Sequence, residues 1–513
     1  MNLLKKNEMK NKIAKIVSVF LVSLVLFGCE EFLKEDPRSL LSPNNFFNSD
    51  VEAQAYVNGV YATYMFNSDL YNVVGISKFY EFGTDLINPN RYGGEGKDFS
   101  KYTITEGNNP TRGTWQNLYR VIQDCNIILD RIEDNENITD AGYKQNRGEA
   151  LFLRALAYYH LTNIWGDVPY YTDNLSIEEI QVLGRNSKSQ IQEGMVGFLQ
   201  EAQNLLPDKY SDNERGRATK WVAATLEAKF YMVRNDWQNM RDKSVEIINN
   251  SWHKLLDDYG AVFNDYPMDE YNDELIWLFD YAKDVAQQRR TDFFTPRLRD
   301  EPKNSADRDA LGAALAERNE GMTGYGLAIP TPQIVNTFPE DDLRRPWNVT
   351  TSYLGYDFKW PYIPKLWNLH QIDSPRSNHG DNTIIFRLAD LYLMVAEAEN
   401  ELNGPAGAYQ YINKVRERAF EPDQPLAGLD QGSFRKAIQN ERVWELMGED
   451  HRRLDLVRWG ILVETVRNTE YNASFAEAVN NIQPHHAYFP IPIQEFDLNP
   501  ALLESDPTNN GYR

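Results

Sequence analysis

The stretch Arg147–Asp173 reads RGEALFLRALAYYHLTNIWGDVPYYTD and decides the fold class of this chain. Up to Trp165 its apolar residues recur at helical spacing on more than one face, which is typical of a buried helix. Small residues alternate with large ones, so a partner helix can approach closely at the alanines. Gly166 then ends the helix, and the following residues turn the chain away. We therefore predict a buried helix with closely packed partner helices.

Two later stretches, Thr219–Trp237 and Ile384–Leu402, repeat this combination of small and bulky residues, and each is followed by a second helical stretch. Ala228 precedes Met240 by twelve residues, and Ala396 stands at the same distance from an alanine of the next helix. This is the layout of a tetratricopeptide helical pair, although no strict period of about 34 residues runs through the chain. The sequence predicts a mainly α fold of divergent tetratricopeptide-like repeats.

Further helices and two long irregular insertions complete the pattern. Helical spacing predicts helices over Asp50–Tyr64, Trp115–Ile132, Ser187–Leu206, Ala406–Ala419 and Phe434–Leu462. The insertions cover residues 66–102 and 258–382, where Gly and Pro interrupt the helical patterns. A structureless loop as long as the second insertion is unusual in a compact domain. We expect an irregular lobe laid over the helices, with short strands such as Glu274–Tyr281.

The N-terminus has the two parts of a bacterial export signal. Met1–Lys15 carries five lysines, and the thirteen residues Ile16–Gly28 are almost wholly apolar but too few for a permanent membrane span. Cys29 follows directly, as in the lipobox of bacterial lipoproteins. We predict a signal peptide over residues 1–28, acyl chains such as palmitate on Cys29, and a mature domain over residues 29–513 on that lipid anchor. The alternative is an ordinary signal peptide with a chance cysteine.

Charge and cysteine content exclude further classes. Removal of residues 1–28, with five lysines and one glutamate, takes the formal net charge from −22 to −26. Nucleic acid is therefore not an expected partner, because its affinity comes largely from Lys and Arg at phosphates. Cys125 is the only other cysteine, so a chain with a lipidated Cys29 forms no internal disulfide. Its stability must come from the apolar core.

The first insertion is rich in aromatic residues, with eight among the 37 residues 66–102 against 12% in the whole chain. Such rings either plug a loop onto the core or form an exposed face on which a ligand stacks, and for any single ring the plug is the commoner outcome. We predict that the ligand-binding residues come from both insertions and include Tyr71, Phe79, Tyr80, Asp85, Tyr92, Phe293, Phe294, Tyr325 and Trp360.

No motif with a catalytic mechanism is present. The sequence lacks a G-x-S-x-G elbow, a P-loop and an H-E-x-x-H zinc motif. A glycosidase needs two carboxylates that flank a sugar bond, but acidic neighbours are expected by chance among 75 acidic residues. The adjacent His485 and His486 have no further ligands at metal-binding spacing. We expect a non-enzymatic protein without a metal or a cofactor.

Several blocks, taken in order along the chain, resemble the SusD/RagB family of outer-membrane nutrient-binding lipoproteins. These blocks are the lipobox cysteine followed by FLKEDP, then RGEALFLRALAYYHLTNIWGDVPYY, GRATKWVAATLEAKFYM, IIFRLADLYLMVAEAE, ERVWELMGEDHRRLDLVRWG and YFPIPIQEFDLNPAL. The resemblance covers nearly the whole chain.

The resemblance implies a lipid-anchored protein on the outer face of the outer membrane. Members of this family cap a SusC-like TonB-dependent barrel transporter and hold a glycan, or in RagB-like members a peptide, over the barrel. The helical units face the transporter, and irregular loops build the ligand face. A glycan is the expected ligand, a peptide is the alternative, and a surface glycoside hydrolase is the less favoured third hypothesis.

Overall fold

The computed structural model describes residues 46–90, 96–211, 214–263, 271–302, 304–367, 369–370 and 378–513. The chain divides into two units, Met1–Asn48 and Ser49–Arg513. Only residues 46–48 of the first unit are described, so the predicted signal peptide and Cys29 lie outside the described residues. The fold below is that of the second unit. Among its described helices, none combines the length and the apolar character that a membrane crossing needs.

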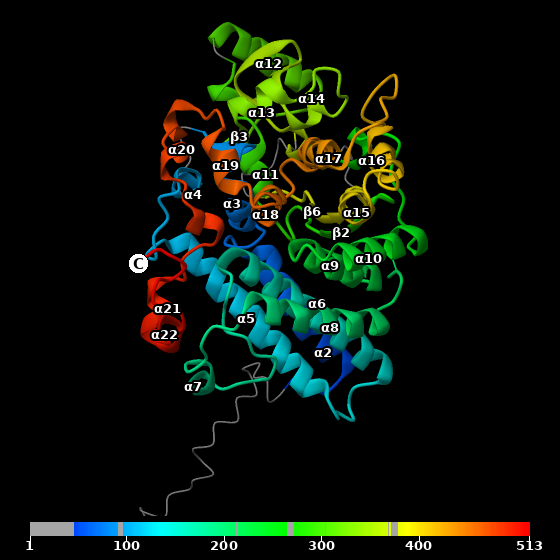
Figure 1. The fold of residues 1–513 in the computed structure, drawn as a ribbon, viewed down its shortest axis with the longest axis vertical. Coiled ribbons are helices and arrows are strands. Elements are labelled where there is room, and N and C mark those ends of the chain that lie inside the picture. The colour runs from blue at the N-terminus through cyan, green and yellow to red at the C-terminus, as the bar shows by residue number, and fades with distance from the viewer. Residues whose placement is uncertain are drawn as a thin grey trace, which may run out of the picture. The chain divides into compact units, whose positions relative to one another are not determined.

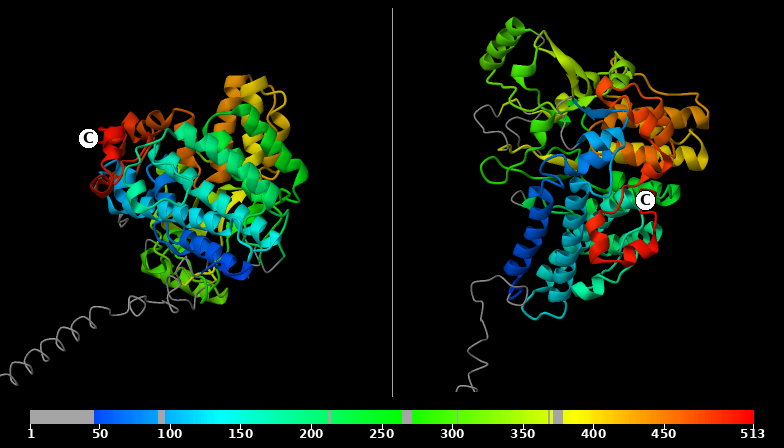
Figure 2. Two further views of the ribbon diagram at one scale, coloured as in Figure 1. Left: turned by 90° about the horizontal axis from the view of Figure 1, so that it is seen from below. Right: turned by 90° about the vertical axis from the view of Figure 1, so that its left-hand side faces the viewer.

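A chain of packed helices forms the scaffold of the second unit (Figure 1). It consists of α2 (Asp50–Phe66), α5 (Asn109–Ile132), α6 (Asp140–Trp165), α8 (Lys188–Leu205), α9 (Lys220–Val233), α10 (Trp237–Asn250), α15 (Leu388–Asn403), α16 (Tyr409–Arg416) and α17 (Gln431–Leu446). Helices α2, α5 and α6 run side by side, as Figure 2 also shows, and α6 packs on α8, α8 on α9, α9 on α10, and α10 on α15. Helix α15 in turn packs on α16 and α17. This arrangement confirms the predicted mainly α fold with tetratricopeptide-like helical pairs.

Helix α6 is buried over most of its length, as its sequence predicted. The side chain of Thr139 caps its first turn by accepting a hydrogen bond from the backbone N–H of Gly142, and Gly166 ends it with a φ of 76°. The C-terminal end of α8 approaches closely at a glycine, because a Cβ on Gly148 would lie 3.3 Å from Cβ of Leu205 and 2.7 Å from Cγ of Leu206, which follows α8 directly. Small residues on α6 therefore set the distance between the two helices.

Two helix boundaries differ from the prediction. Ile384–Leu402 is not one helix, because its first residues form strand β6 (Thr383–Arg387) in an antiparallel pair with β2 (Leu275–Phe279). The chain over Phe434–Leu462 is also broken, because Gly448 and Asp450 have positive φ angles of 79° and 62°. Such angles cannot continue a right-handed helix. The chain continues as α18 (Arg452–Arg458) and α19 (Leu462–Arg467).

The first insertion contains more regular structure than predicted. Its described part forms α3 (Gly75–Tyr80), β1 (Ile87–Pro89) and α4 (Gly96–Lys101). The prediction of a non-helical segment was wrong there, because each of these helices has only 6 residues, too few for a visible apolar period.

The second insertion forms the predicted lobe of short elements. Its described part includes β2 within the predicted strand Glu274–Tyr281, together with α11 (Arg290–Phe294), α12 (Ser305–Glu317), β3 (Ala328–Pro330), α13 (Pro332–Thr337), α14 (Arg345–Asn348), β4 (Thr350–Tyr353) and β5 (Tyr356–Tyr362). Strands β1 and β3 pair antiparallel, with Asn88 opposite Ile329, so the two insertions meet in one small sheet. The described C-terminal region adds α20 (Ala478–Asn481), α21 (Ile493–Leu498) and α22 (Ala501–Ser505), and α7 (Ile177–Ile180) lies between α6 and α8.

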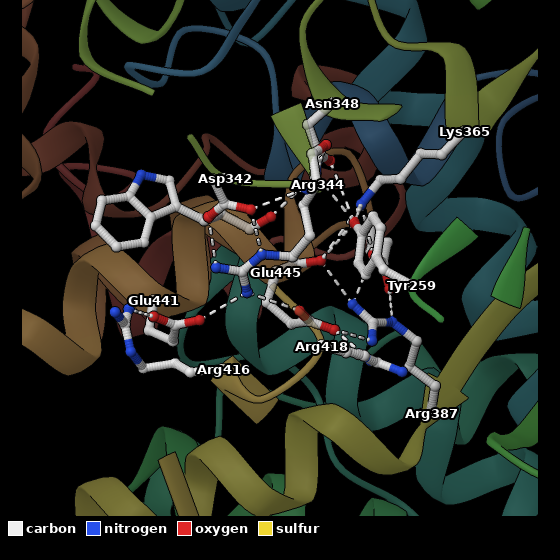
Figure 3. A network of polar contacts seen from close by, with 12 residues as sticks. Tyr259, Asp342, Arg344, Asn348, Lys365, Arg387, Arg416, Arg418, Glu441 and Glu445 are labelled. Atoms are coloured by element: carbon white, nitrogen blue, oxygen red, sulfur yellow. Dashed lines mark hydrogen bonds and ion pairs between the residues drawn. The ribbon is translucent and has the colours of Figure 1, made fainter. Parts of the chain in front are cut away.

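A network of buried ion pairs joins the second insertion to the helical scaffold (Figure 3). Arg344 of the insertion contacts Asp342 at 2.7 Å, and it reaches Glu441 at 2.6 Å and Glu445 at 2.9 Å on α17. All four side chains are excluded from solvent. Because removal of one partner would leave a buried charge uncompensated, this network fixes the insertion on α17.

Glu445 lies at the centre of this network. Its Oε1 accepts hydrogen bonds from Arg387 at 2.6 Å and from Arg418 at 2.8 Å. Burial acts to raise the pKa of Glu445, but the positive charges of Arg418, Arg387 and Arg344 outweigh it and hold the pKa well below its usual range. The surrounding arginines therefore keep the carboxylate in its ionised form at neutral pH.

Candidate functional site

Tyr71 and Tyr80, both predicted as ligand-binding residues, lie in the core. Their side chains are only 3% and 2% exposed. The hydroxyl of Tyr71 lies 2.8 Å from Nε2 of His160, and the hydroxyl of Tyr80 lies 2.9 Å from its Nδ1. Burial lowers the pKa of His160 to about 3, so the imidazole is neutral, and one tyrosine donates to it while the other accepts. These two rings anchor the first insertion on α6.

Phe79 and Phe294 are buried as well. The ring of Phe79 lies 5.1 Å from that of Phe99, 5.6 Å from that of Trp165 and 4.9 Å from that of Phe489. These two side chains and those of the two tyrosines on His160 are almost wholly buried, so the structure corrects their expected place on an exposed stacking face, and Phe79 and Tyr80 instead contribute to the lining of a cavity between α6, α8 and α9. All four side chains plug their segments onto the core.

Asp85 and Tyr92 have different outcomes. Tyr92 lies outside the described residues. The carboxylate of Asp85 accepts two hydrogen bonds from Arg452, from Nε and from Nη2, each at 2.7 Å. This bidentate pair neutralises Asp85 and ties the first insertion to α18.

Phe293 and Tyr325 are two accessible aromatic residues of the predicted set that lie in contact. Both side chains are half-buried, and their ring centroids are 6.2 Å apart with an angle of 59° between the ring planes. Two backbone hydrogen bonds hold their segments together, from the N–H of Tyr325 to the carbonyl of Asp292 at 2.6 Å and from the N–H of Leu327 to the carbonyl of Phe293 at 2.7 Å. We call these two rings the aromatic pair.

The first insertion supports the aromatic pair from the other side. Asn90 follows β1 directly, and its side-chain amide donates to the carbonyl of Gly326 at 2.6 Å. Its backbone N–H donates to the carbonyl of Leu327 at 2.7 Å. Residues far apart in the sequence are thus fixed beside each other, and the aromatic pair lies where the two insertions meet.

A polar pair joins Asp292, the residue directly before Phe293, to His379. Nε2 of His379 lies 2.9 Å from Oδ1 of the buried Asp292, and the carbonyl of His379 accepts a hydrogen bond from the backbone N–H of Gln288 at 2.9 Å. Burial acts to lower the pKa of His379, but the hydrogen bond and the charge of Asp292 outweigh it and raise the pKa. This pair holds the backbone of α11 in place beneath the aromatic pair.

Trp360, the remaining predicted residue, lies on β5. It shares a face of the strand with Phe358 and Tyr362, which are buried in a cluster that also contains Ile329 of β3, and Trp360 itself is half-buried against this cluster. Strand β5 lies beside β3, so Trp360 belongs to the same lobe as the aromatic pair. Among the described residues, no ring contact joins Trp360 to Phe293 or Tyr325.

Sequence reasoning missed a second aromatic surface. A groove of about 430 Å³ is lined by Trp444 of α17, by Trp459 and by the amide side chains of Asn440 and Asn468, with the Asp85–Arg452 pair at its edge. Both tryptophans are half-buried. The sequence around both tryptophans is typical of a structural helix. The one feature that could have indicated a binding surface was an amide or a charged residue within four positions of each tryptophan.

Within the described ranges, no group of three or more His, Cys, Asp or Glu side chains has the arrangement of a metal site. The geometry instead offers two surfaces on which the apolar face of a ligand can stack, with polar groups beside them. The aromatic pair is the one that the sequence predicted.

Two family profiles match the chain. One is described as the SusD family and matches residues 335–512, and the other is described as starch-binding associating with outer membrane and matches residues 31–232. SusD-like protein P25 of Formosa agariphila is 46% identical, over 97% of this chain and 99% of its own length.

Solved structures show the same fold. A SusD homologue of Bacteroides thetaiotaomicron has a TM-score of 0.76 at 22% identity, covering 91% of this chain and 98% of that one. A structure described as a laminarin-binding SusD-like protein has a TM-score of 0.71 at 23% identity, covering 88% of this chain and 98% of that one.

Proposed function

The chain belongs to the SusD family, and from this premise we propose that it binds an oligo- or polysaccharide at the cell surface and passes it to a TonB-dependent outer-membrane transporter. Cys29 carries the lipid anchor in this proposal, and residues 29–513 form the binding domain. The protein acts by binding and performs no chemistry on its ligand.

The aromatic pair carries the ligand part of the proposal. Sugars present apolar C–H faces that stack on aromatic rings, while hydroxyl groups bind to polar groups at the rim. Phe293 and Tyr325 offer two inclined rings, each half-buried, on a lobe that the buried ion pairs hold in place. The fold is shared with a protein described as laminarin-binding, and one matching profile is described as starch-binding, which supports a glycan as the ligand class.

A binding panel tests the ligand class. The full chain, extracted in mild detergent, is titrated calorimetrically with soluble starch, laminarin, other neutral oligosaccharides and a mixture of short peptides. We expect binding of at least one glycan with a dissociation constant of about 1 μM to 1 mM, and no release of shorter products after incubation. Binding of peptides alone would favour the RagB-like alternative, and release of products would favour a hydrolase.

The transporter part of the proposal rests on the family and on the packed helices of the scaffold, a type of surface that tetratricopeptide-like repeats use for partners. Pull-down of the tagged protein in mild detergents should recover a large barrel protein in comparable amount. Recovery of the lipoprotein alone in several mild detergents would contradict this part while leaving glycan binding untouched.

A further inference from the structure

A large cavity lies away from the aromatic pair and shares no lining residue with it. It has a volume of about 550 Å³ and lies between the end of α6, the first turn of α8, the end of α9 and α18. Sites for small molecules commonly enclose about 300–1,000 Å³, so this cavity has the size of a binding site.

The charge of its lining sets this cavity apart from the rest of the molecule. Lys188, Arg234, Arg453 and Arg458 line it, and none of its lining residues is an aspartate or a glutamate. The whole chain has a formal net charge of −22, so a wall with only positive charges is exceptional in it. Such a wall attracts anions into the cavity.

Arg458 differs from the other three cations because carboxylates neutralise it. Its guanidinium contacts Glu397 at 2.6 Å and Asp455 at 2.8 Å. Within the described residues, Lys188, Arg234 and Arg453 have no carboxylate within ion-pair distance. Three positive charges without a direct ion pair among the described residues therefore line one cavity, and the charge of Asp167 acts on Lys188 among them.

Arg453 is the deepest of these cations, with only 5% of its surface exposed. Its guanidinium donates a hydrogen bond to the carbonyl of His486 and lies 4.8 Å from the ring centroid of Phe489 and 5.9 Å from that of Tyr102. A buried cation without a counter-charge is costly, and an anion bound in the cavity would offset that cost. A guanidinium also matches the planar fork of a carboxylate or sulfate.

Lys188 stands at the entrance to the same cavity. Its Nζ donates to Oδ1 of Asn163 at 3.0 Å and lies 5.4 Å from the ring centroid of Tyr488. The backbone N–H of Lys188 donates to Asp167 at 2.7 Å, and the charge of this carboxylate also acts to raise the pKa of the ammonium group without an ion pair at contact distance. Burial lowers the pKa of Lys188 to about 8, which leaves the side chain charged at neutral pH.

The remaining lining suits a sugar. The ring of Tyr488 is half-buried, so it has an accessible part on which a pyranose can stack. Asn163, Ser189 and Gln192 add amide and hydroxyl groups of the kind that bind sugar hydroxyls. The lining thus combines charge for an oxyanion with an aromatic ring and neutral polar groups for the rest of a sugar unit.

We propose that this cavity binds an acidic sugar unit, with its carboxylate or sulfate at Arg453 and Lys188 and its ring on Tyr488. This inference rests on the proposed function, because it assumes that the ligands are glycans. It adds a second site, separate from the aromatic pair, and it names acidic sugars as the ligand class of that site.

Titration of the full chain with four small probes tests the inference: glucuronate, glucose 6-sulfate, glucose and inorganic sulfate. We expect the two acidic sugars to bind about tenfold or more tightly than glucose and inorganic sulfate. The variants K188M and R234M should lose about tenfold in affinity for the acidic sugars, because each loses one charge at the cavity. K144M, which removes an exposed lysine of α6 away from the cavity, is the matched control.

K188M and R234M carry the test, because both residues are only half-buried and their substitution should leave the fold intact. R453M is added where circular dichroism shows a folded protein. Unchanged affinity of K188M and R234M for the acidic sugars would overturn the site. Equal affinity for inorganic sulfate and glucose 6-sulfate would overturn the sugar assignment. The double variant F293A/Y325A should keep its affinity for glucuronate, because the aromatic pair lies apart from the cavity. Loss of glycan binding in F293A/Y325A tests the proposed function, and loss of glucuronate binding in K188M and R234M tests this inference, so the two can fail separately.

Discussion

The ring of Phe293 lies 6.2 Å from the ring of Tyr325, with 59° between the two ring planes. The two residues come from different segments of the second insertion, and backbone hydrogen bonds hold these segments side by side. Two inclined, half-buried rings at a fixed distance are suited to the curved face of a saccharide chain rather than to a single flat molecule.

Substitution of the aromatic pair should therefore weaken glycan binding. A stacked ring contributes on the order of 1 kcal/mol, so F293A or Y325A alone should weaken binding severalfold and the double variant by about 30-fold. Calorimetric titration with the best glycan of the panel measures this. Both side chains lie half-exposed on the lobe, so the melting temperature should change little.

The groove with Trp444 and Trp459 provides the control for that experiment. W444A should leave the affinity within about twofold of wild type if the aromatic pair holds the ligand. Loss of binding in W444A together with normal binding in F293A/Y325A would move the glycan site to the groove beside the Asp85–Arg452 pair.

The scaffold was predictable because its signal is local. In α6 and α9 the small and bulky residues recur at helical spacing, and this pattern is visible within each helix's own sequence. The start of α15 was not predictable in this way. Ile384 and its neighbours are as apolar as the helix that follows, and only pairing with β2, which is distant in the sequence, makes them a strand.

The binding face was harder to predict than the fold. Tyr71, Tyr80 and Tyr325 each stand within four residues of a glycine in the insertions, so their local sequences do not separate them. What separates them is His160 of α6, because its two ring nitrogens form hydrogen bonds with the hydroxyls of Tyr71 and Tyr80 in the core. Nothing in the first insertion indicates that partner, because the contact forms only in the folded chain.

The buried ion network makes a prediction about stability. In E445Q the shape of the side chain is kept, but Arg387, Arg418 and Arg344 lose their common counter-charge. We expect a loss of about 3–5 kcal/mol in the free energy of unfolding, measured by urea denaturation. E417Q is the matched control, because Glu417 forms an exposed pair with Lys414 and should cost less than about 1 kcal/mol. Similar losses in both variants would show that the network adds nothing specific.

The predicted anchor is testable in cells. C29A removes the only acceptor for lipid in the predicted lipobox, so the variant should leave the outer-membrane fraction and appear in soluble form, while the wild type stays with the membrane. Fractionation and immunoblotting measure this. C125A is the matched control, because Cys125 is buried in α5 and should not affect the distribution. A C29A protein that still partitions with the outer membrane would contradict the lipobox.

His160 predicts a pH dependence of stability. Burial lowers its pKa in the folded state to about 3, whereas an unfolded histidine titrates near 6.5. Below about pH 6.5 the unfolded state therefore binds a proton that the folded state does not bind. The contribution of His160 is therefore fully present above about pH 6.5 and is lost as the pH falls toward 3. Between about pH 7.5 and 5 the free energy of unfolding should fall by about 2 kcal/mol on account of His160. About 1.5 pH units of this range lie below the unfolded pKa, and each contributes about 1.36 kcal/mol.

The variant H160Q isolates this contribution, because glutamine keeps a donor and an acceptor for Tyr71 and Tyr80 but does not titrate. Urea denaturation of wild type and H160Q at about pH 7.5, 6 and 5 gives the two slopes. We expect H160Q to be less stable at every pH, because its side chain fits the site less well, but its stability should fall by about 2 kcal/mol less between pH 7.5 and 5. The other buried histidines, such as His451 with a pKa lowered to about 3, act equally in both proteins and cancel in the difference. Parallel slopes for the two proteins would mean that His160 takes up a proton in the folded state, and the neutral imidazole between the two tyrosines would then be wrong.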